Sequence, residues 1–117
     1  MTITRLHAGP RMSQAVIHGS TIYLAGQVAD QAKGKSVGDQ TQEILATIDR
    51  LLGEAGSDKT KILSTTIYLA DIGTFAEMNA VWDAWVPAGH VPARATVEAK
   101  LAALAYTVEI ACIAAKS

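Results

Sequence analysis

The chain is 117 residues long, a length that favours a single domain. Half of its residues are hydrophobic and 18% are charged, a balance that excludes an intrinsically disordered protein. Ten basic and eleven acidic residues leave a net charge of −1, so we expect no general attraction to nucleic acid or to an anionic membrane. A single cysteine excludes an internal disulfide, and no apolar run has the length of a membrane span or a secretion signal, which together predict a soluble cytoplasmic protein.

The first half of the chain is predicted to contain a hairpin followed by a helix. Residues 13–19 and 20–27 are two strand-like runs that are interrupted at Gly19 and Ser20, which suit the turn. Residues 38–55 have the 3.6-residue period of an amphipathic helix. Its apolar face carries Ile44, Leu45, Ile48, Leu51, Leu52 and Ala55.

The second half repeats a strand and a helix and then adds two strands. We predict strands at residues 62–70, 94–99 and 107–114, and a helix at residues 72–86 that ends before Pro87. Thr74 and Glu77 have the spacing of a capping box. The sequence TIYLA occurs at residues 21–25 and again at 66–70, each time before a predicted helix. This indicates two similar strand–helix halves, although strands also reuse the same residue types by chance.

The last predicted strand is apolar on both of its faces. Val108, Ile110 and Cys112 alternate with Ala111 and Ile113, so neither face suits contact with water. Two helices can cover only one face of a sheet of this size. We therefore expect the other face to pack against another subunit.

Two charged residues interrupt these apolar strands. Arg94 lies in the run PARATVE (residues 92–98), and Glu109 lies in TVEIACIA (residues 107–114). An unpaired charge is costly to bury, so each is expected to have a partner. An arginine fork matches a planar carboxylate, and a glutamate nearby can hold or activate a water molecule. The alternative interpretation is structural: a salt bridge for Arg94 and a buried ion pair for Glu109.

At this point the chain resembles the reactive intermediate deaminase family, also called Rid or YjgF. The similar segments are YLAGQ at residues 23–27, Gln40 and Thr41 at the first helix, MNAVW at 78–82, PARATVE at 92–98 and VEI at 108–110. The resemblance covers nearly the whole chain. It implies an α+β, chorismate-mutase-like fold, with two helices packed on one face of a mixed β-sheet, that assembles as a homotrimer with clefts between subunits.

The resemblance also implies an activity. Members that carry the arginine hydrolyse enamines and imines such as 2-aminoacrylate to 2-oxo acids and ammonia, without a metal or another cofactor. Arg94 matches the anchor of the substrate carboxylate, and Glu109 matches the acidic residue that positions water. Thr96 occupies the place of a cysteine whose main chain faces the substrate. Met12 and Ala25 replace a tyrosine and a serine of the best-studied subgroup, which places this chain in a different subgroup.

Four further positions are candidates for substrate binding. Ser13 offers a hydroxyl near the expected cleft, Gly26 a backbone amide, Asn79 a polar side chain and Trp82 an aromatic wall. With Ala25 and Thr96 they complete the predicted substrate-binding set around Arg94. A solvent-exposed position for Asn79 and a packing role for Trp82 are the alternatives. The three histidines lack the spacing of metal ligands, and Cys112 is expected to be a small buried side chain.

Two other functions remain open from the sequence. The first is a small-ligand-binding or chaperone-like trimer with little turnover, which the loss of hydroxyls at Met12 and Ala25 favours and the presence of Arg94 and Glu109 opposes. The second is a specialised catabolic hydrolase for a bulkier cyclic or aromatic imine, which a cleft without the tyrosine would suit. The deaminase of small 2-imino acids remains the leading hypothesis.

Overall fold

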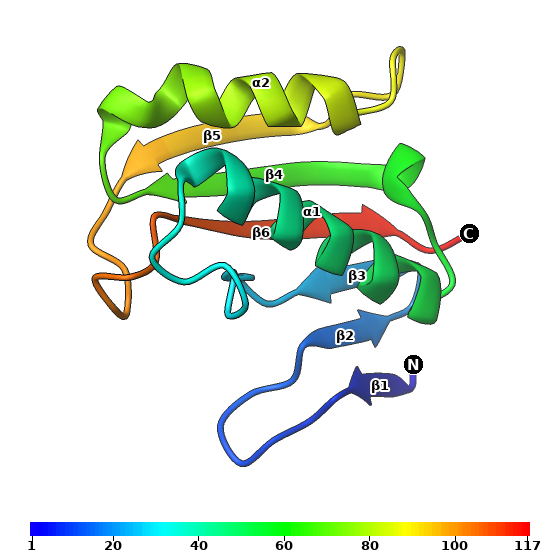
Figure 1. Ribbon diagram of the computed structural model, residues 1–117. Helices are drawn as coiled ribbons and strands as arrows, with labels where there is room; N and C mark the ends of the chain where they lie inside the picture. Colours follow the sequence, from blue (N-terminus) through cyan, green and yellow to red (C-terminus); the bar gives the residue numbers. More distant parts are fainter.

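Six strands form one mixed sheet in the computed structural model, which describes residues 1–117 (Figure 1). The order across the sheet is β1-β2-β3-β6-β4-β5, and only β5 runs parallel to its neighbour. The strands are β1 (Ile3–Leu6), β2 (Ala15–His18), β3 (Thr21–Leu24), β4 (Ile62–Leu69), β5 (Ala93–Glu98) and β6 (Val108–Ala115).

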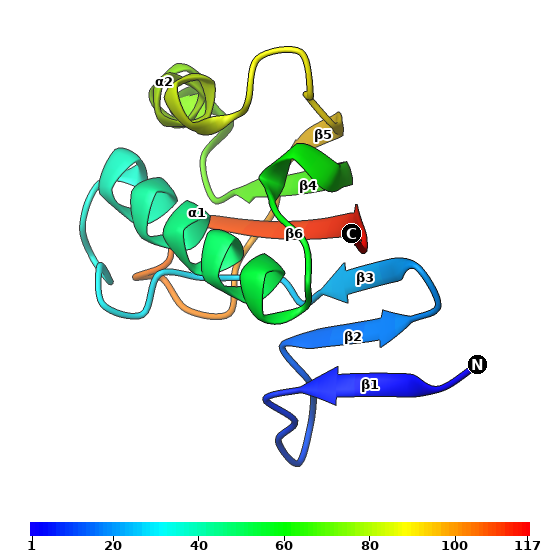
Figure 2. The same cartoon turned by 90° about the vertical axis from the view of Figure 1, so that its right-hand side faces the viewer.

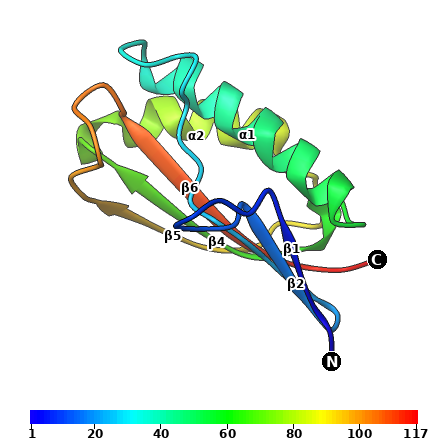
Figure 3. The same cartoon turned by 90° about the horizontal axis from the view of Figure 1, so that it is seen from below.

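Both helices lie on the same face of this sheet (Figure 3). Helix α1 (Val37–Glu54) lies over the middle of the sheet, and α2 (Phe75–Trp85) lies toward the β4–β5 edge (Figure 2). The predicted α+β architecture, with two helices on one face of a mixed sheet, is therefore confirmed. Neither helix is both long and apolar enough to cross a membrane.

The core fills the space between the helices and the sheet. Ile44 and Ile48 of α1 are fully buried there, as are Ile67 of β4 and Ile110 of β6, which are directly paired across the two strands. Burial of each such side chain contributes roughly 1.5–3 kcal/mol relative to its exposure. Helix α1 starts at Val37 because Ser36 caps it: the Asp39 backbone N–H donates to Ser36 Oγ at 3.1 Å.

The second helix begins differently from the prediction. A short 3₁₀ turn (Ile72–Thr74) precedes α2, and Thr74 makes no side-chain cap. The capping box is wrong because both of its side chains have other partners: Thr74 donates its hydroxyl to the Asp71 carbonyl, and Glu77 accepts a bond from the Gly38 N–H at 2.8 Å. Glu77 thus ties the start of α2 to the start of α1.

The TIYLA repeat has a structural counterpart. Its two copies form β3 and β4, which flank β6 on either side, and each strand leads toward a helix. In both copies isoleucine and leucine are buried, whereas Tyr23 is exposed and Tyr68 half-buried on the opposite face. The two strand–helix halves suggested by the repeat are therefore present.

Two features of the sheet differ from the sequence-based expectation. Strand β1 was not predicted, because its ITRL sequence is short, exposed and lacks an alternating apolar pattern. Strands β5 and β6 follow each other in the chain but do not form a hairpin, since β4 lies between them. The parallel β4–β5 pairing requires the crossover through α2 that separates these strands in the chain.

The sheet face that bears no helix carries many apolar side chains, and we call it the open face. Tyr23, Val97 and Ile113 are 46%, 43% and 36% exposed there. Alternation along the paired strands places on this face Val16, Tyr23, Thr66, Tyr68, Ala95, Val97, Glu109, Ala111 and Ile113.

Candidate functional site

The Arg94 side chain is held against helix α2. It extends from the helix-covered face of β5, and its Nη1 donates a hydrogen bond to Asn79 Oδ1 at 2.8 Å. The guanidinium carbon lies 5.3 Å from the centre of the Trp82 ring and 5.7 Å from that of Phe75. Two aromatic faces and one amide therefore hold the cation in place. We call this arrangement the Arg94 clamp.

The clamp is built from one stripe of α2. Phe75, Asn79 and Trp82 are spaced i, i+4 and i+7, which places them on one side of the helix, facing the β5 edge. The asparagine uses one of the five guanidinium N–H donors, so the remaining donors are free for a ligand. Phe75 is a site residue that the sequence analysis does not include. Its i, i+4, i+7 spacing with two predicted site residues was the signal that it belongs to the site.

Thr96 and Glu98 lie on the same face of β5 as Arg94 but differ in their hydrogen bonds. The Thr96 hydroxyl is buried and has no hydrogen-bond partner within the chain. Glu98 instead accepts a bond from the Ile72 backbone N–H at 3.0 Å and so anchors the turn before α2. Thr96 thus adds an unused hydroxyl beside the Arg94 clamp.

Glu109 lies in a separate place, against the turn that follows β3. A Cβ built on Gly26 would lie 2.1 Å from Glu109 Oε2, so any larger residue at this position would displace the carboxylate. The close approach follows from the pairing of Gln27 with Ile110, whose backbone groups exchange hydrogen bonds of 2.8 and 3.1 Å. The Gly26 turn and the Glu109 carboxylate therefore form one local unit.

The two charged residues lie on opposite faces of the sheet. Arg94 is level with Thr65, which is level with Cys112 of β6, and the Thr65 hydroxyl contacts the Cys112 sulfur at 3.4 Å on the helix-covered face. Glu109 is three residues from Cys112 and so has the opposite orientation, level with Tyr68 on the open face. The Arg94 and Glu109 side chains of one chain therefore do not meet in one cleft. No salt bridge uses either residue.

The predicted site residues fall into two groups accordingly. Asn79, Trp82 and Thr96 surround Arg94 on the helix-covered face. The other group lies around the Glu109 turn: the Ala25 N–H donates to the Gln14 carbonyl at 2.9 Å, and the half-buried Ser13 directly precedes Gln14. Ser13, Ala25 and Gly26 thus belong to the region of Glu109, away from the Arg94 clamp.

Cys112 lies in the core between these regions. It is 2% exposed, and burial raises the pKa of its thiol to about 11. A thiol with this pKa is a poor nucleophile at neutral pH. The chain contains no group of three or more His, Cys, Asp or Glu side chains that could hold a metal ion.

Comparisons with known proteins agree across the whole chain. The profile of the family described as Endoribonuclease L-PSP matches residues 2–116. The RutC family protein YoaB of Escherichia coli K12 is 48% identical over 115 residues, which cover 98% of this chain and 99% of that protein. A crystal structure of a YjgF family member from Neisseria meningitidis is similar with a TM-score of 0.97 and 48% identity, covering 100% of this chain and 97% of that one. The 2-iminobutanoate/2-iminopropanoate deaminase of Rattus norvegicus is 33% identical over 107 residues, with 87% and 77% coverage.

Proposed function

Because this chain belongs to the YjgF, or reactive intermediate deaminase, family, we propose that it hydrolyses small 2-imino acids and their enamine tautomers to 2-oxo acids and ammonia. The rat relative bears the name of such a deaminase, whereas the name of the more similar YoaB carries no activity. The observation that carries the proposal is the Arg94 clamp, because it presents a fixed guanidinium beside an unused hydroxyl.

The clamp suits recognition of a carboxylate. A small imino acid offers an enzyme little to bind except its carboxylate, and arginine binds this group through two parallel hydrogen bonds. Asn79, Phe75 and Trp82 fix the guanidinium before the substrate arrives, which lowers the entropy lost on binding. Arg94 would thus anchor the substrate and direct its C=N carbon toward the water.

Glu109 would supply the proton transfers. Water adds its oxygen to the C=N carbon while the Glu109 carboxylate accepts a proton from it, and that proton passes to the nitrogen. The Glu109 carboxylate then moves the hydroxyl proton of the resulting amino alcohol to its nitrogen, while the C=O bond forms and the C–N bond breaks, which releases ammonia and the 2-oxo acid. The Glu109 carboxylate packs against the Gly26 turn, whose backbone would help to position the water.

A site with both residues needs two copies of the chain. Since Arg94 and Glu109 lie on opposite faces of one sheet, we propose that each cleft takes Arg94 from one subunit and Glu109 from its neighbour. The apolar open face, which includes Tyr23, Val97 and Ile113, would be covered by this contact. We propose a homotrimer, so that three equivalent clefts form around one axis.

The test generates imines in situ from several amino acids with an amino-acid oxidase and traps them with semicarbazide. We expect the protein to divert the imines from the trap, and Arg94→Ala to lower the rate roughly 100-fold by loss of the positioned carboxylate. The Arg94→Lys variant should recover little of the deaminase rate, because lysine lacks the planar guanidinium group. Lys35→Ala is the control for loss of a positive charge, since Lys35 is exposed in the connection before α1.

The assembly is measured on the same samples. We expect a mass near three times the 12.3 kDa of the chain in sedimentation equilibrium at micromolar concentration. A monomeric mass would refute the shared cleft. A correctly assembled trimer that diverts neither aliphatic nor aromatic imines would instead support a ligand-binding protein without turnover.

A further inference from the structure

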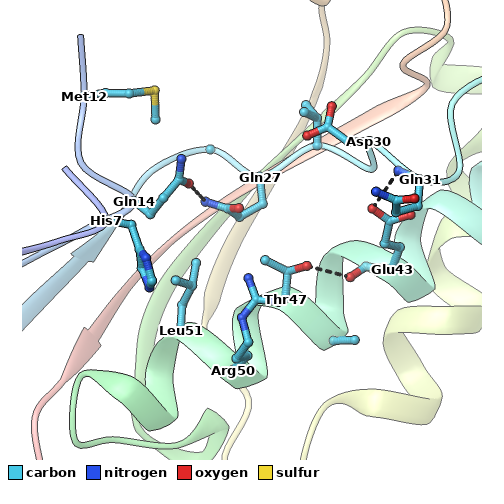
Figure 4. Close-up of a pocket in the computed structure, with 13 residues that line it drawn as sticks. His7, Met12, Gln14, Gln27, Asp30, Gln31, Glu43, Thr47, Arg50 and Leu51 are labelled. Atoms are coloured by element: carbon cyan, nitrogen blue, oxygen red, sulfur yellow. Dashed lines mark hydrogen bonds between the residues drawn. The ribbon is translucent and has the colours of Figure 1, made fainter. Parts of the chain in front are cut away.

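A second cavity lies apart from the Arg94 clamp, between helix α1 and the connection that joins β1 to β2 (Figure 4). Its volume is about 800 Å³, within the range of small-molecule sites. Gly26 is the one predicted site residue that lines it, and the Arg94 clamp and Glu109 do not. The proposed deaminase reaction uses neither Arg50 nor Glu43, the charged residues that line this cavity.

The two ends of the cavity carry opposite charges. Arg50 rises from α1 between Leu51 and Thr47 at one end, and Asp30 and Glu43 lie at the other (Figure 4). No salt bridge in the chain uses Arg50, so its guanidinium is free to bind an anion. Glu43 uses only Oε2, which accepts a bond from the Gln31 N–H at 3.2 Å, and its other oxygen is free.

Two amide side chains, the buried Gln27 and the half-buried Gln14, also line the cavity. Gln27 is only 7% exposed, and its Nε2 donates to Gln14 Oε1 and to the Ala25 carbonyl, both at 3.0 Å. Both N–H groups of the Gln27 amide are used in these bonds. The Gln27 side-chain oxygen and the Gln14 amino group have no partner in the chain and remain available to a ligand. This donor and this acceptor lie at the two outer ends of the hydrogen-bonded Gln14–Gln27 pair, and together they suit the N–H and C=O groups of a peptide backbone.

We propose that this cavity is a second ligand site that binds a short, extended peptide of two or three residues. The peptide carboxylate would bind Arg50, its ammonium group would bind the free oxygen of Glu43, and its backbone would bind the Gln14–Gln27 pair. Asp30 adds negative charge at the Glu43 end, although its Oδ1 already accepts a bond from the Tyr106 hydroxyl and lies 3.9 Å from Lys33 Nζ. Glu43 and Arg50 are seven residues apart on α1, which separates them by about 10 Å along the helix axis. A single amino acid spans only about 3.5 Å, whereas three extended residues span about 10 Å.

The experiment is calorimetric titration of the intact, assembled protein with triglycine as the probe. Three related compounds remove one feature each: N-acetyl-triglycine lacks the ammonium group, triglycinamide lacks the carboxylate, and glycine lacks the length. We expect saturable binding of triglycine, and at least about tenfold weaker binding of each of the others, because each loses a charge-assisted contact or cannot bridge the two ends.

Variants assign each end of the probe to a residue. Arg50→Gln should weaken triglycine about tenfold but leave triglycinamide nearly unchanged, since that compound has no carboxylate to lose. Glu43→Gln should weaken triglycine and leave N-acetyl-triglycine unchanged for the corresponding reason. Arg5→Gln, with the same charge change outside the cavity, should bind as the parent protein does.

Three results would overturn the proposal. The first is that the folded parent protein shows no saturable binding of triglycine in the millimolar range. The second is that Arg50→Gln and Arg5→Gln lose the same amount of triglycine affinity. The third is that Arg94→Ala no longer binds triglycine. The last result would place the peptide in the deaminase cleft. Binding that survives Arg94→Ala supports the second site whether or not the protein hydrolyses imines, so the two proposals can fail independently.

Discussion

The two faces of the sheet present their charged residues in different ways. On the helix-covered face, Arg94 is enclosed by Asn79, Phe75 and Trp82 of the same chain, so its geometry is complete before any partner arrives. On the open face, Glu109 has the Gly26 turn on one side and no covering layer of helix above it. One residue is positioned by its own subunit, whereas the surroundings of the other depend on what covers the open face.

This contrast explains how a small domain can build a site from charges that face apart. A chain of 117 residues has two helices and covers one sheet face with them. The same assembly that buries the open face would bring Glu109 of one copy to Arg94 of another. Under the proposed trimer, burial of apolar surface and completion of the site are one event.

The strongest test of a cleft that takes Arg94 and Glu109 from different subunits is a mixing experiment. Arg94→Ala and Glu109→Gln should each lower the deaminase rate about 100-fold, because each removes one half of the site. When the two inactive variants are unfolded together and co-assembled in equal amounts, about one quarter of the clefts should contain both native residues. Imine diversion should then return to about a quarter of the parent rate. No recovery in verified mixed trimers would show that one subunit supplies both residues.

A narrower test displaces Glu109 without changing it. Gly26→Ala places a methyl group where the Glu109 carboxylate lies, 2.1 Å from Oε2, so the carboxylate must move. We expect roughly a tenfold to 100-fold loss of kcat with a nearly unchanged KM, since the carboxylate anchor on the other face is intact.

The matched control for this test is Gly53→Ala. A methyl group at Gly53 meets nothing within 4 Å, and the residue lies inside α1. This substitution should leave the rate unchanged and raise the free energy of unfolding by about 0.5–1 kcal/mol. Equal losses of activity in both variants would contradict the role of the Gly26–Glu109 contact.

A substitution in the Arg94 clamp should have a smaller effect, and it should change KM and not kcat. Asn79→Ala removes the acceptor that holds Arg94 Nη1 and should raise KM by about tenfold while kcat changes little. Asp83→Ala, an exposed position on the same helix, serves as the control and should change neither constant. A fall in kcat with constant KM would show that Asn79 acts in the chemical step and does not position Arg94 for binding.

The smallest expected effect concerns the buried thiol of Cys112. Because burial raises the pKa of the Cys112 thiol to about 11, the folded protein holds this proton more tightly than the unfolded chain, whose thiol has a pKa of 9.0. The corresponding stability is complete below pH 9 and is lost as the pH rises toward 11, by about 2 to 3 kcal/mol.

Denaturant unfolding at pH 8 and pH 10.5 measures this loss, with Cys112→Ala as the reference that lacks the thiol. The pH dependence should be weaker in that variant. The native thiol should also resist alkylation at pH 8 and react once the chain is unfolded. Rapid alkylation of the folded protein at pH 8 would contradict the burial of this residue.

Much of the fold follows from local patterns. The apolar period of α1 and the alternation of β4 and β6 depend on neighbouring residues, so the sequence located these elements to within a few residues. Strand β1 was missed because it is a short edge strand, stabilised by pairing with β2 more than by burial of its own side chains. The Thr74–Glu77 capping box failed because Glu77 has a partner in α1 that no local pattern reveals.

The candidate site, like the fold, depends partly on local sequence and partly on tertiary structure. The sequence by itself determined that two charges, Arg94 and Glu109, lie within apolar strands, and it offered Asn79 and Trp82 of the second helix as candidate binding residues. Only the tertiary structure decided which face each charge occupies. Strand β4 is inserted between β5 and β6, and the pairing registers across it set the orientation of each residue. Orientation in a sheet alternates with every residue, so it depends on long-range register, which a linear pattern does not contain.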